Sequence, residues 1–264
     1  MKTIPSILAL YILLLGTAKI NVGHQPMTGS DFIKAVKDMD ADSRDQLFIE
    51  KVTTGSLPEF MNRFVRIDVS IIDSATEETV NAYYFVMPDY LCIGTNDDFM
   101  RMPIQPKYAQ QIANHFDCFL STKKISDDVY KSAVIKLEPH PLTIDRDSLY
   151  TFVEHNSIIE EQRQSREGLI AGHKKDVIIT HKIIKDPRPN RVALYGWHKL
   201  DGTPIQPVYT GHVDWYVDYS HGFRLVQQMI YINGAPMHYI DVMKHPLYSR
   251  LICDEEDCDF YAYP

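Results

Sequence analysis

The chain has 264 residues, with 27 Lys and Arg against 35 Asp and Glu, and its formal net charge is −8. Nucleic acids are bound by clustered basic faces, whereas acidic residues here are spread along the whole chain, so the composition argues against a nucleic acid partner. The length suffices for one large domain or two small ones, with a sizeable core.

The first 18 residues have the pattern of a signal peptide. Lys2 precedes an almost wholly apolar run at 4–15, and the small residues Gly16 and Ala18 fit cleavage before Lys19. This run is shorter than the roughly 20 residues that a membrane-spanning helix needs, and charged or turn residues interrupt every later one. We therefore predict a secreted, extracellular protein that does not span a membrane. A buried amino-terminal helix is the alternative.

Four cysteines remain after cleavage: Cys92, Cys118, Cys253 and Cys258. An even number in an oxidising compartment predicts two disulfide bonds. Of the three connectivities, Cys253 with Cys258 and Cys92 with Cys118 closes the shortest loops. A structural zinc site is the alternative, although no pair of Cys-x-x-Cys clusters occurs. The same compartment argues against Cys118 as a catalytic thiol.

The first half of the chain is mainly helical in pattern. Apolar residues from Asp31 onward have helical spacing, with Ser30 as a plausible N-cap. Two antiparallel strands are predicted at 64–71 and 80–87, where β-branched residues and tyrosines accumulate. Helices are predicted from the apolar spacing at 30–39, 42–52, 108–116, 125–133 and 148–167.

The second half is richer in strands. Four are predicted, at 177–184, 191–198, 215–219 and 223–232. The dipeptides Asp201-Gly202 and Asn233-Gly234 accept a positive φ at low cost, so each is predicted to close a hairpin.

These elements predict an α+β fold, in which a helix-rich N-terminal half packs on a mainly antiparallel, strand-rich C-terminal half. No Ser- or Gly-rich linker separates the halves, so we expect a single domain over 19–264. A subdomain joint would fall in the proline-marked stretch 138–143. Two independent domains are the alternative.

Polar residues gather beside glycines in four segments of the second half. These are GHKKD at 172–176, YGWH at 195–198, YTGH at 209–212 and DYSHGFR at 218–224. Glycine lets backbone or ligand approach closely, and imidazole titrates near neutral pH. The usual signatures of nucleotide-binding loops, serine hydrolases and zinc proteases are absent. We therefore predict one working site built from these segments.

Within this site a nucleophile, its base and an orienting carboxylate can be assigned. Ser220 would act with His221 or His173, and Asp218 or Asp176 would orient the base. His198 shares strand parity with apolar neighbours and should point inward, where it either joins the site or satisfies a core hydrogen bond. The candidate catalytic residues are His173, Asp176, His198, Asp218, Ser220 and His221.

Two further roles follow from the same segments. Lysine and arginine could hold an anionic substrate group and tryptophan could contact the substrate, which gives Lys174, Lys175, Trp197 and Arg224 as candidate binding residues. Solvated lysines are the alternative. Imidazoles could instead bind one zinc ion, with His173, His198, His212 and His221 as ligands, although no pair has a diagnostic spacing. The predicted cofactor is thus none or a single zinc ion.

The segments also carry a resemblance. Over 88–254 the chain resembles an uncharacterised family of secreted bacterial and fungal proteins, through DYL at 89–91, GHKKD, YGWH, PIQP at 204–207 and YVDYSHG at 216–222. No activity is attached to that family. The resemblance implies a common site and leaves its chemistry open.

A fainter likeness is to the L,D-transpeptidases, whose motif reads Ser-His-Gly-Cys-x-Arg. Here Ser220-His221-Gly222 leads directly to Phe223-Arg224, so the nucleophilic cysteine is missing. The activity is therefore not carried across.

The leading hypothesis is a secreted hydrolase acting on a polar polymer or peptide through the His, Asp, Ser and Lys residues of the C-terminal half. The alternative is a secreted binding protein or toxin-like effector without turnover. In either case the partner is an extracellular polymer, a peptide or a component of a target cell.

Overall fold

The computed structural model describes residues 26–264. The predicted signal peptide, residues 1–18, lies outside them. Among the described helices, none combines the length and the apolar character needed to cross a membrane.

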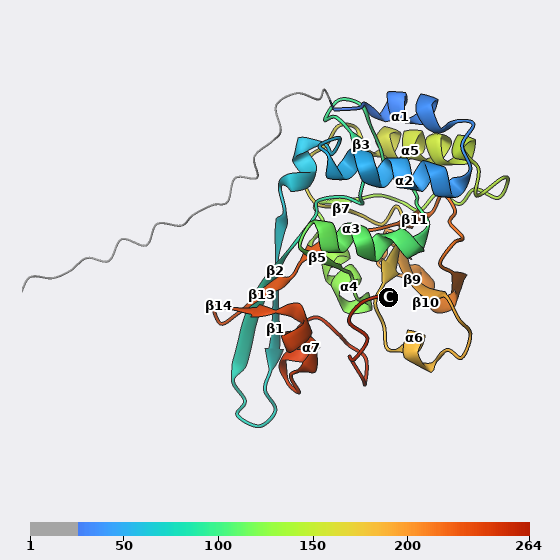
Figure 1. Cartoon of the computed structure of the whole chain (residues 1–264). Helices are drawn as coiled ribbons and strands as arrows, with labels where there is room; N and C mark the ends of the chain where they lie inside the picture. Colours follow the sequence, from blue (N-terminus) through green and yellow to red (C-terminus); the bar gives the residue numbers. More distant parts are fainter. Residues whose placement is uncertain (1–25) are drawn as a thin grey trace, which may run out of the picture.

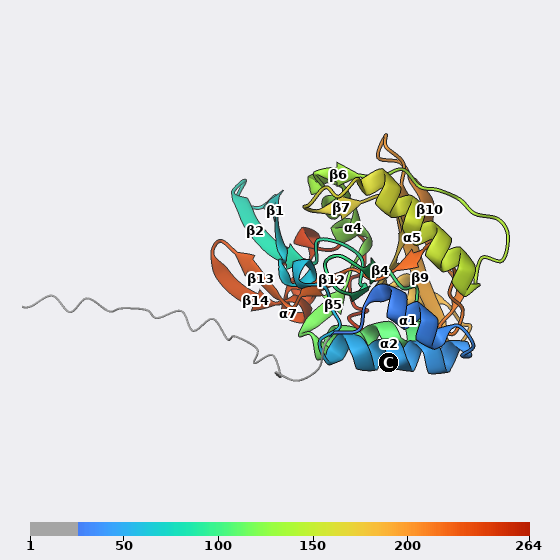
Figure 2. The same cartoon turned by 90° about the horizontal axis from the view of Figure 1, so that it is seen from above.

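Two helices open the described chain. α1 (Gly29–Val36) begins after Thr28, whose side chain accepts a hydrogen bond from the amide of Asp31, so the N-cap is Thr28 and not the predicted Ser30. α2 (Ala41–Thr53) is capped in the same way by Asp40. Figure 1 shows α1, α2 and the later helix α5 (Leu149–Arg163) together at one end of the molecule, and Figure 2 shows the same helices from above.

The larger sheet combines strands from both halves of the sequence. β1 (Val65–Ile72) and β2 (Thr79–Val86) form the predicted antiparallel hairpin, which projects away from the helices (Figure 1). β2 then pairs with β12 (Leu225–Gln227) and β13 (Met229–Ile232), giving the order β14-β13-β2-β12-β5 with β1 beside β2. The outer strands are β14 (Ala235–His238) and β5 (Cys118–Leu120). The helix-rich and strand-rich halves are therefore interleaved.

The second sheet carries most of the predicted site and has the order β10-β9-β8-β11. β9 (Arg191–His198) and β10 (Pro204–Val213) form the hairpin predicted at Asp201-Gly202. β8 (Lys175–Ile178) runs antiparallel to β9, and the short β11 (His221–Gly222) lies parallel to β8.

Shorter elements connect these sheets. They are η1 (Glu59–Asn62), β3 (Ile93–Gly94), β4 (Phe99–Met100), η2 (Pro106–Tyr108), α3 (Ala109–His115), α4 (Lys123–Ser132), β6 (Ile135–Lys136), β7 (Ile170–Ala171), α6 (Lys182–Lys185), α7 (Tyr239–Lys244) and η3 (Tyr248–Leu251). The fold class is α+β, and nearly all strand pairs are antiparallel, as predicted; β11 with β8 and β6 with β7 are parallel.

Three predicted strands in the second half were wrong in extent or kind. The strand predicted at 177–184 ends at Ile178, the last residue of β8. Beyond it the amide of Ile183 donates to the carbonyl of Thr180, and the chain enters α6. Residues 215–219 form no strand, since the amides of Tyr216 and Tyr219 bond to Val213 and Arg146 rather than to a neighbouring strand. The strand predicted at 223–232 is divided into β12 and β13. The turn at Asp201-Gly202 was predicted, but no range was given for β10, the strand that follows it.

The main hydrophobic core extends from Phe32 on α1 to Ile252 after η3, and includes Leu120, Leu225 and Val226 with no exposed surface. Since these residues come from both ends of the sequence, the core joins the two halves. Burial of apolar surface on this scale is the main favourable term in folding.

One predicted disulfide forms and the other does not. Cys253 and Cys258 are bonded, with their Cα atoms 6.3 Å apart. Cys92 and Cys118 are free thiols in the core, so the predicted bridge between them was wrong. Burial raises the pKa of Cys118 to about 12 and that of Cys92 well above its ordinary value, so both side chains act as small apolar groups.

This arrangement predicts a simple thiol count. The native, unreduced protein should not react with a thiol reagent, because both free thiols are buried, whereas denaturant should expose two reactive thiols per chain. The measurement is a colorimetric thiol titration with and without denaturant. A count of zero in denaturant would mean that Cys92 and Cys118 are bridged.

Candidate functional site

The residues singled out in the sequence surround strand β8 but fall on two sides of it. Successive side chains of a strand point to opposite faces, so Lys175 and Asp176 leave β8 in opposite directions. Lys175 lies opposite His221 of β11, and Asp176 lies opposite Gly222. The predicted residues do not surround one shared cavity. Most of them belong to three groups, each with its own contacts.

The first group is a buried network centred on Asp89. One carboxylate oxygen of Asp89 is 3.0 Å from Nε2 of His173, and the other accepts two hydrogen bonds, at 2.8 and 2.6 Å, from the guanidinium of Arg101. Arg101 also donates to Glu160 of α5 at 2.7 Å. The ring of Tyr90 packs edge-on against His173, with centroids 4.9 Å apart.

The charges of this network are fixed by their partners. Burial alone would raise the pKa of Asp89, but Arg101 and His173 outweigh it and hold that pKa well below its usual value. Burial lowers the pKa of His173 to about 4, against the attraction of Asp89. His173 is only 1% exposed, and its Nε2 atom is held by Asp89.

The second group surrounds His198. Its Nε2 atom is 3.0 Å from Oδ1 of Asp127, and the same oxygen accepts a hydrogen bond of 2.6 Å from the hydroxyl of Tyr195. Lys123 donates to the other oxygen of Asp127, and the ring of Tyr130 stacks on His198 at 4.6 Å. His198 thus points inward as predicted and is held by a carboxylate that the sequence did not single out.

The third group lies at the junction of β8 and β11, and we call it the β8–β11 cluster: Arg146, Lys175, His212, Asp218 and His221. Asp218 accepts hydrogen bonds from Arg146 at 2.6 Å and, through its other oxygen, from the hydroxyl and amide of Ser220 at 2.5 and 2.8 Å.

His221 is the least satisfied member of the β8–β11 cluster. It has no exposed surface, and neither ring nitrogen has a hydrogen-bond partner in the described structure. Its Nε2 atom is 3.7 Å from Oδ1 of Asp218, beyond hydrogen-bond distance. Burial lowers the pKa of His221 to about 3. A buried polar group without a partner is costly, and a catalytic role is one of the reasons for which a protein retains such a group.

Two aromatic side chains separate His221 from solvent. The ring of His212 lies edge-on to His221 with centroids 5.0 Å apart, and Tyr216 stacks on His212 at 5.5 Å. Both are half-buried. Burial lowers the pKa of His212, while Asp218 opposes that shift. His212 and Arg146, whose side chain is 42% exposed, are therefore the members of the cluster that solvent or a ligand can reach.

The two adjacent lysines have different surroundings. Lys174 is buried and donates a hydrogen bond of 2.6 Å to the carbonyl of Tyr219, and burial lowers its pKa to about 7. Lys175 places its ammonium group 5.1 Å from the ring centre of Trp197, whose buried Nε1 has no partner in the described structure. Its pKa is also lowered by burial, against the attraction of Asp218. Both lysines are buried, so the alternative prediction that they are solvated was wrong.

On the opposite face of β8, Asp176 is buried and accepts a hydrogen bond of 3.1 Å from the hydroxyl of Tyr90. Burial raises the pKa of Asp176, against the attraction of Arg224. Arg224 donates to the carbonyls of Met87 and Ile170 and lies 4.6 Å from the ring centre of Tyr90. Arg224 is 2% exposed and its guanidinium is held by these carbonyls, so its role in substrate binding stays a prediction.

The predicted four-histidine zinc site is wrong. His173 bonds to Asp89 and His198 to Asp127, and only His212 and His221 are neighbours. Between residues 26 and 264, no group of three or more His, Cys, Asp or Glu side chains is arranged to hold a metal ion.

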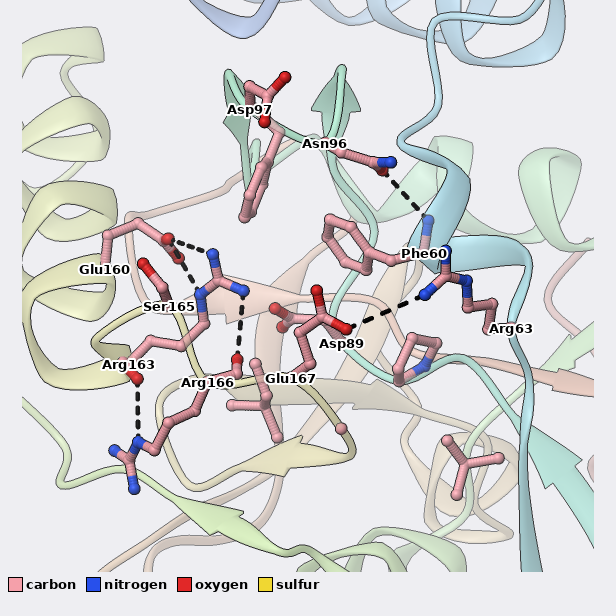
Figure 3. A pocket seen from close by; sticks show the side chains of 15 residues that line it. Phe60, Arg63, Asp89, Asn96, Asp97, Glu160, Arg163, Ser165, Arg166 and Glu167 are labelled. Atoms are coloured by element: carbon pink, nitrogen blue, oxygen red, sulfur yellow. Dashed lines mark hydrogen bonds and ion pairs between the residues drawn. The ribbon is translucent and has the colours of Figure 1, made fainter.

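A cavity of about 680 Å³ lies apart from the predicted segments, beside Asp89 (Figure 3). Its walls come from the end of η1, the β3–β4 turn, the last turn of α5 and the chain that follows it. Sequence reasoning missed this site because its residues are distant in sequence and belong to no motif. Asp89 alone had been noted, in the segment 89–91.

No protein-family model, curated protein or solved structure matches this chain. The resemblances to a secreted family and to the L,D-transpeptidases therefore stay predictions, and the site must be argued from its own geometry.

Gly222 offers a test of the packing beneath the cluster. A Cβ atom there would lie 2.6 Å from the ring of the buried Tyr90. A Cβ at Gly211 would lie 2.0 Å from the end of the Tyr209 side chain, but that side chain is 50% exposed and can rotate into solvent at lower cost. Gly222→Ala should thus lower the free energy of unfolding by about 1–3 kcal/mol, the usual cost of overpacking, and Gly211→Ala by less. Chemical denaturation measures both, and equal losses would contradict the contact.

The buried histidines predict how stability depends on pH. The pKa values of His173 and His221 are lowered by burial to about 4 and about 3, while an unfolded histidine titrates near 6.5. Below about pH 6.5 the unfolded chain therefore binds more protons than the folded one, so stability present above that pH is lost as the pH falls toward about 4. Urea unfolding across this range should show the decline. His221→Gln should make it shallower, and an unchanged slope would contradict the assignment.

Proposed function

We propose that the protein is a hydrolase acting on a polar polymer or peptide, and that the β8–β11 cluster is its reaction site. The observation that carries this proposal is His221, a fully buried imidazole with two unpartnered nitrogens beside the Asp218 carboxylate. Unsatisfied, titratable groups held in a fixed geometry are the usual material of catalytic sites.

The members of the cluster suit separate steps of hydrolysis. Asp218 is held as an anion, because the pKa-raising effect of burial is outweighed by His221, Ser220 and Lys175. His212 is half-buried with a lowered pKa, so it is neutral near pH 7 and can accept a proton from water. Lys175 and Arg146 supply positive charge for the oxyanion that develops during attack.

Ser220 has a different role in this proposal from the one predicted. Its hydroxyl is buried and donates to Asp218 rather than to a histidine. We infer that Ser220 positions Asp218 and that activated water is the nucleophile. The residues His173 and His198 would then be positioning and core residues, since each is bound to its own carboxylate.

Exposed aromatic residues near the cluster favour an extended polar substrate. Tyr209 and Trp215 are 50% and 54% exposed, and Tyr209 lies 5.6 Å from His212 between ring centres. Exposed aromatic rings combine a large contact surface with a polar tip, which suits sugar rings and peptide groups. The predicted signal peptide would place this activity outside the cell.

The test is an assay of hydrolysis with three substrates: peptidoglycan, an acidic polysaccharide and casein. Hydrolysis is measured as the release of reducing ends or amines. His212→Gln and Lys175→Met should each lower kcat/KM by about a hundredfold or more, the usual range for a lost acid–base group, while Tm changes little. His115→Gln, an exposed histidine on α3, is the matched control and should leave the rate unchanged.

Three results would contradict the hydrolase proposal. These are no hydrolysis of any substrate tested, wild-type rates in both cluster variants, and an equal loss of rate in the His115 control. Saturable binding of a polymer without turnover would instead support the second candidate, a binding protein.

A further inference from the structure

The cavity beside Asp89 has the size and lining of a ligand site. At about 680 Å³ it falls within the 300–1,000 Å³ typical of small-molecule sites. Figure 3 shows Phe60 and several charged side chains around it, and Phe99 also belongs to its lining. None of the β8–β11 cluster lines it, so it is separate from the proposed reaction site.

The floor of this cavity is apolar and aromatic. Phe60 and Phe99 meet edge to face with ring centres 5.1 Å apart, and Val65, Pro88 and Ile170 complete the surface. Such a floor favours an aromatic or branched apolar side chain, which would bury its surface there.

Three charged side chains of the wall are held in close ion pairs, and Arg166 donates to the main-chain carbonyls of Gln162 and Arg163. Glu160 bonds to Arg101 and to Arg163, each at 2.7 Å, and Asp89 is held by Arg101. Since each of the paired groups already has a charged partner at hydrogen-bond distance, it would gain little from a charged group of a ligand.

One pair of opposite charges is only loosely joined. Arg63 follows η1 and Glu167 lies on the chain beyond α5, and their nearest charged atoms are 3.9 Å apart. Their side chains are 66% and 83% exposed, and no hydrogen bond joins them. An exposed pair with this geometry contributes little to stability, so a ligand that separates the two groups loses little by doing so.

We propose that this cavity binds a free zwitterionic amino acid, with its carboxylate on Arg63, its ammonium on Glu167 and an apolar side chain on Phe60 and Phe99. A zwitterion replaces the loose ion pair with two charge-assisted hydrogen bonds and adds no net charge to the cavity. This inference does not depend on the hydrolase proposal, because it concerns binding at a different place.

The probes are L-phenylalanine, N-acetyl-phenylalanine, phenylalanine amide and the dipeptide Gly-Phe, measured by titration calorimetry on the full-length protein. Acetylation removes the ammonium and amidation removes the carboxylate, so each should weaken binding by about tenfold or more relative to the unblocked probe. Gly-Phe keeps the carboxylate but moves the ammonium one residue away, so it should bind more weakly than phenylalanine, and equal or tighter binding would contradict the contact with Glu167.

Two variants assign the charges. Arg63→Gln should weaken binding of phenylalanine by about tenfold but leave binding of phenylalanine amide unchanged, and Glu167→Gln should show the same selectivity toward N-acetyl-phenylalanine. Arg66→Gln, an exposed arginine of β1 paired with Asp68, is the matched control. Absence of saturable binding by any of the four probes, or equal losses for blocked and unblocked probes, overturns the proposal.

Discussion

The buried carboxylate of Asp89 ties together parts of the chain that are far apart in sequence. Through Arg101 it is connected to Glu160 on α5, and through His173 to the chain that enters β8. Its own backbone neighbour, Tyr90, reaches across to Asp176 on β8. Removing one member of such a buried ion pair typically costs about 3–5 kcal/mol, because the remaining charge is left uncompensated. The position of β8, and with it the β8–β11 cluster, depends on this network.

Strand β8 then divides the chemistry between its faces. The ionic interior with Asp176, Tyr90 and Arg224 lies on one side, and Lys175 with His221 lies on the other. On the first side each of these groups has at least one partner, although Oδ1 of Asp176 has none in the described structure. On the second side the imidazole of His221 lacks any partner in the described structure, and the half-buried His212 lies between it and solvent. The proposed reaction site is marked by the imidazole of His221, both of whose nitrogens lack a partner, beside the Asp218 carboxylate.

Local patterns carried much of the fold. Helical spacing located α1, α2 and α4, alternation located the β1–β2 hairpin, and the two turn dipeptides located the hairpins of β9–β10 and β13–β14. Patterns failed where a short apolar run had no ladder partner, as at 215–219, or where a turn began, as after Thr180. The pairing of Cys92 with Cys118 failed because loop length says nothing about where two buried residues lie in the core.

The sequence by itself determined the α+β class, most helices and hairpins, and the segments in which polar residues meet glycines, since these depend on neighbours a few residues apart. Only the tertiary structure decided that His173 belongs to Asp89, that His198 belongs to Asp127, and that His212 and His221 lie together. The partners Asp89 and Asp127 are separated from their histidines by more than 70 residues, and the strand order β9-β8-β11 brings distant loops together. Periodicity has no access to such long-range choices, because they are made by core packing and by the pairing of buried charges.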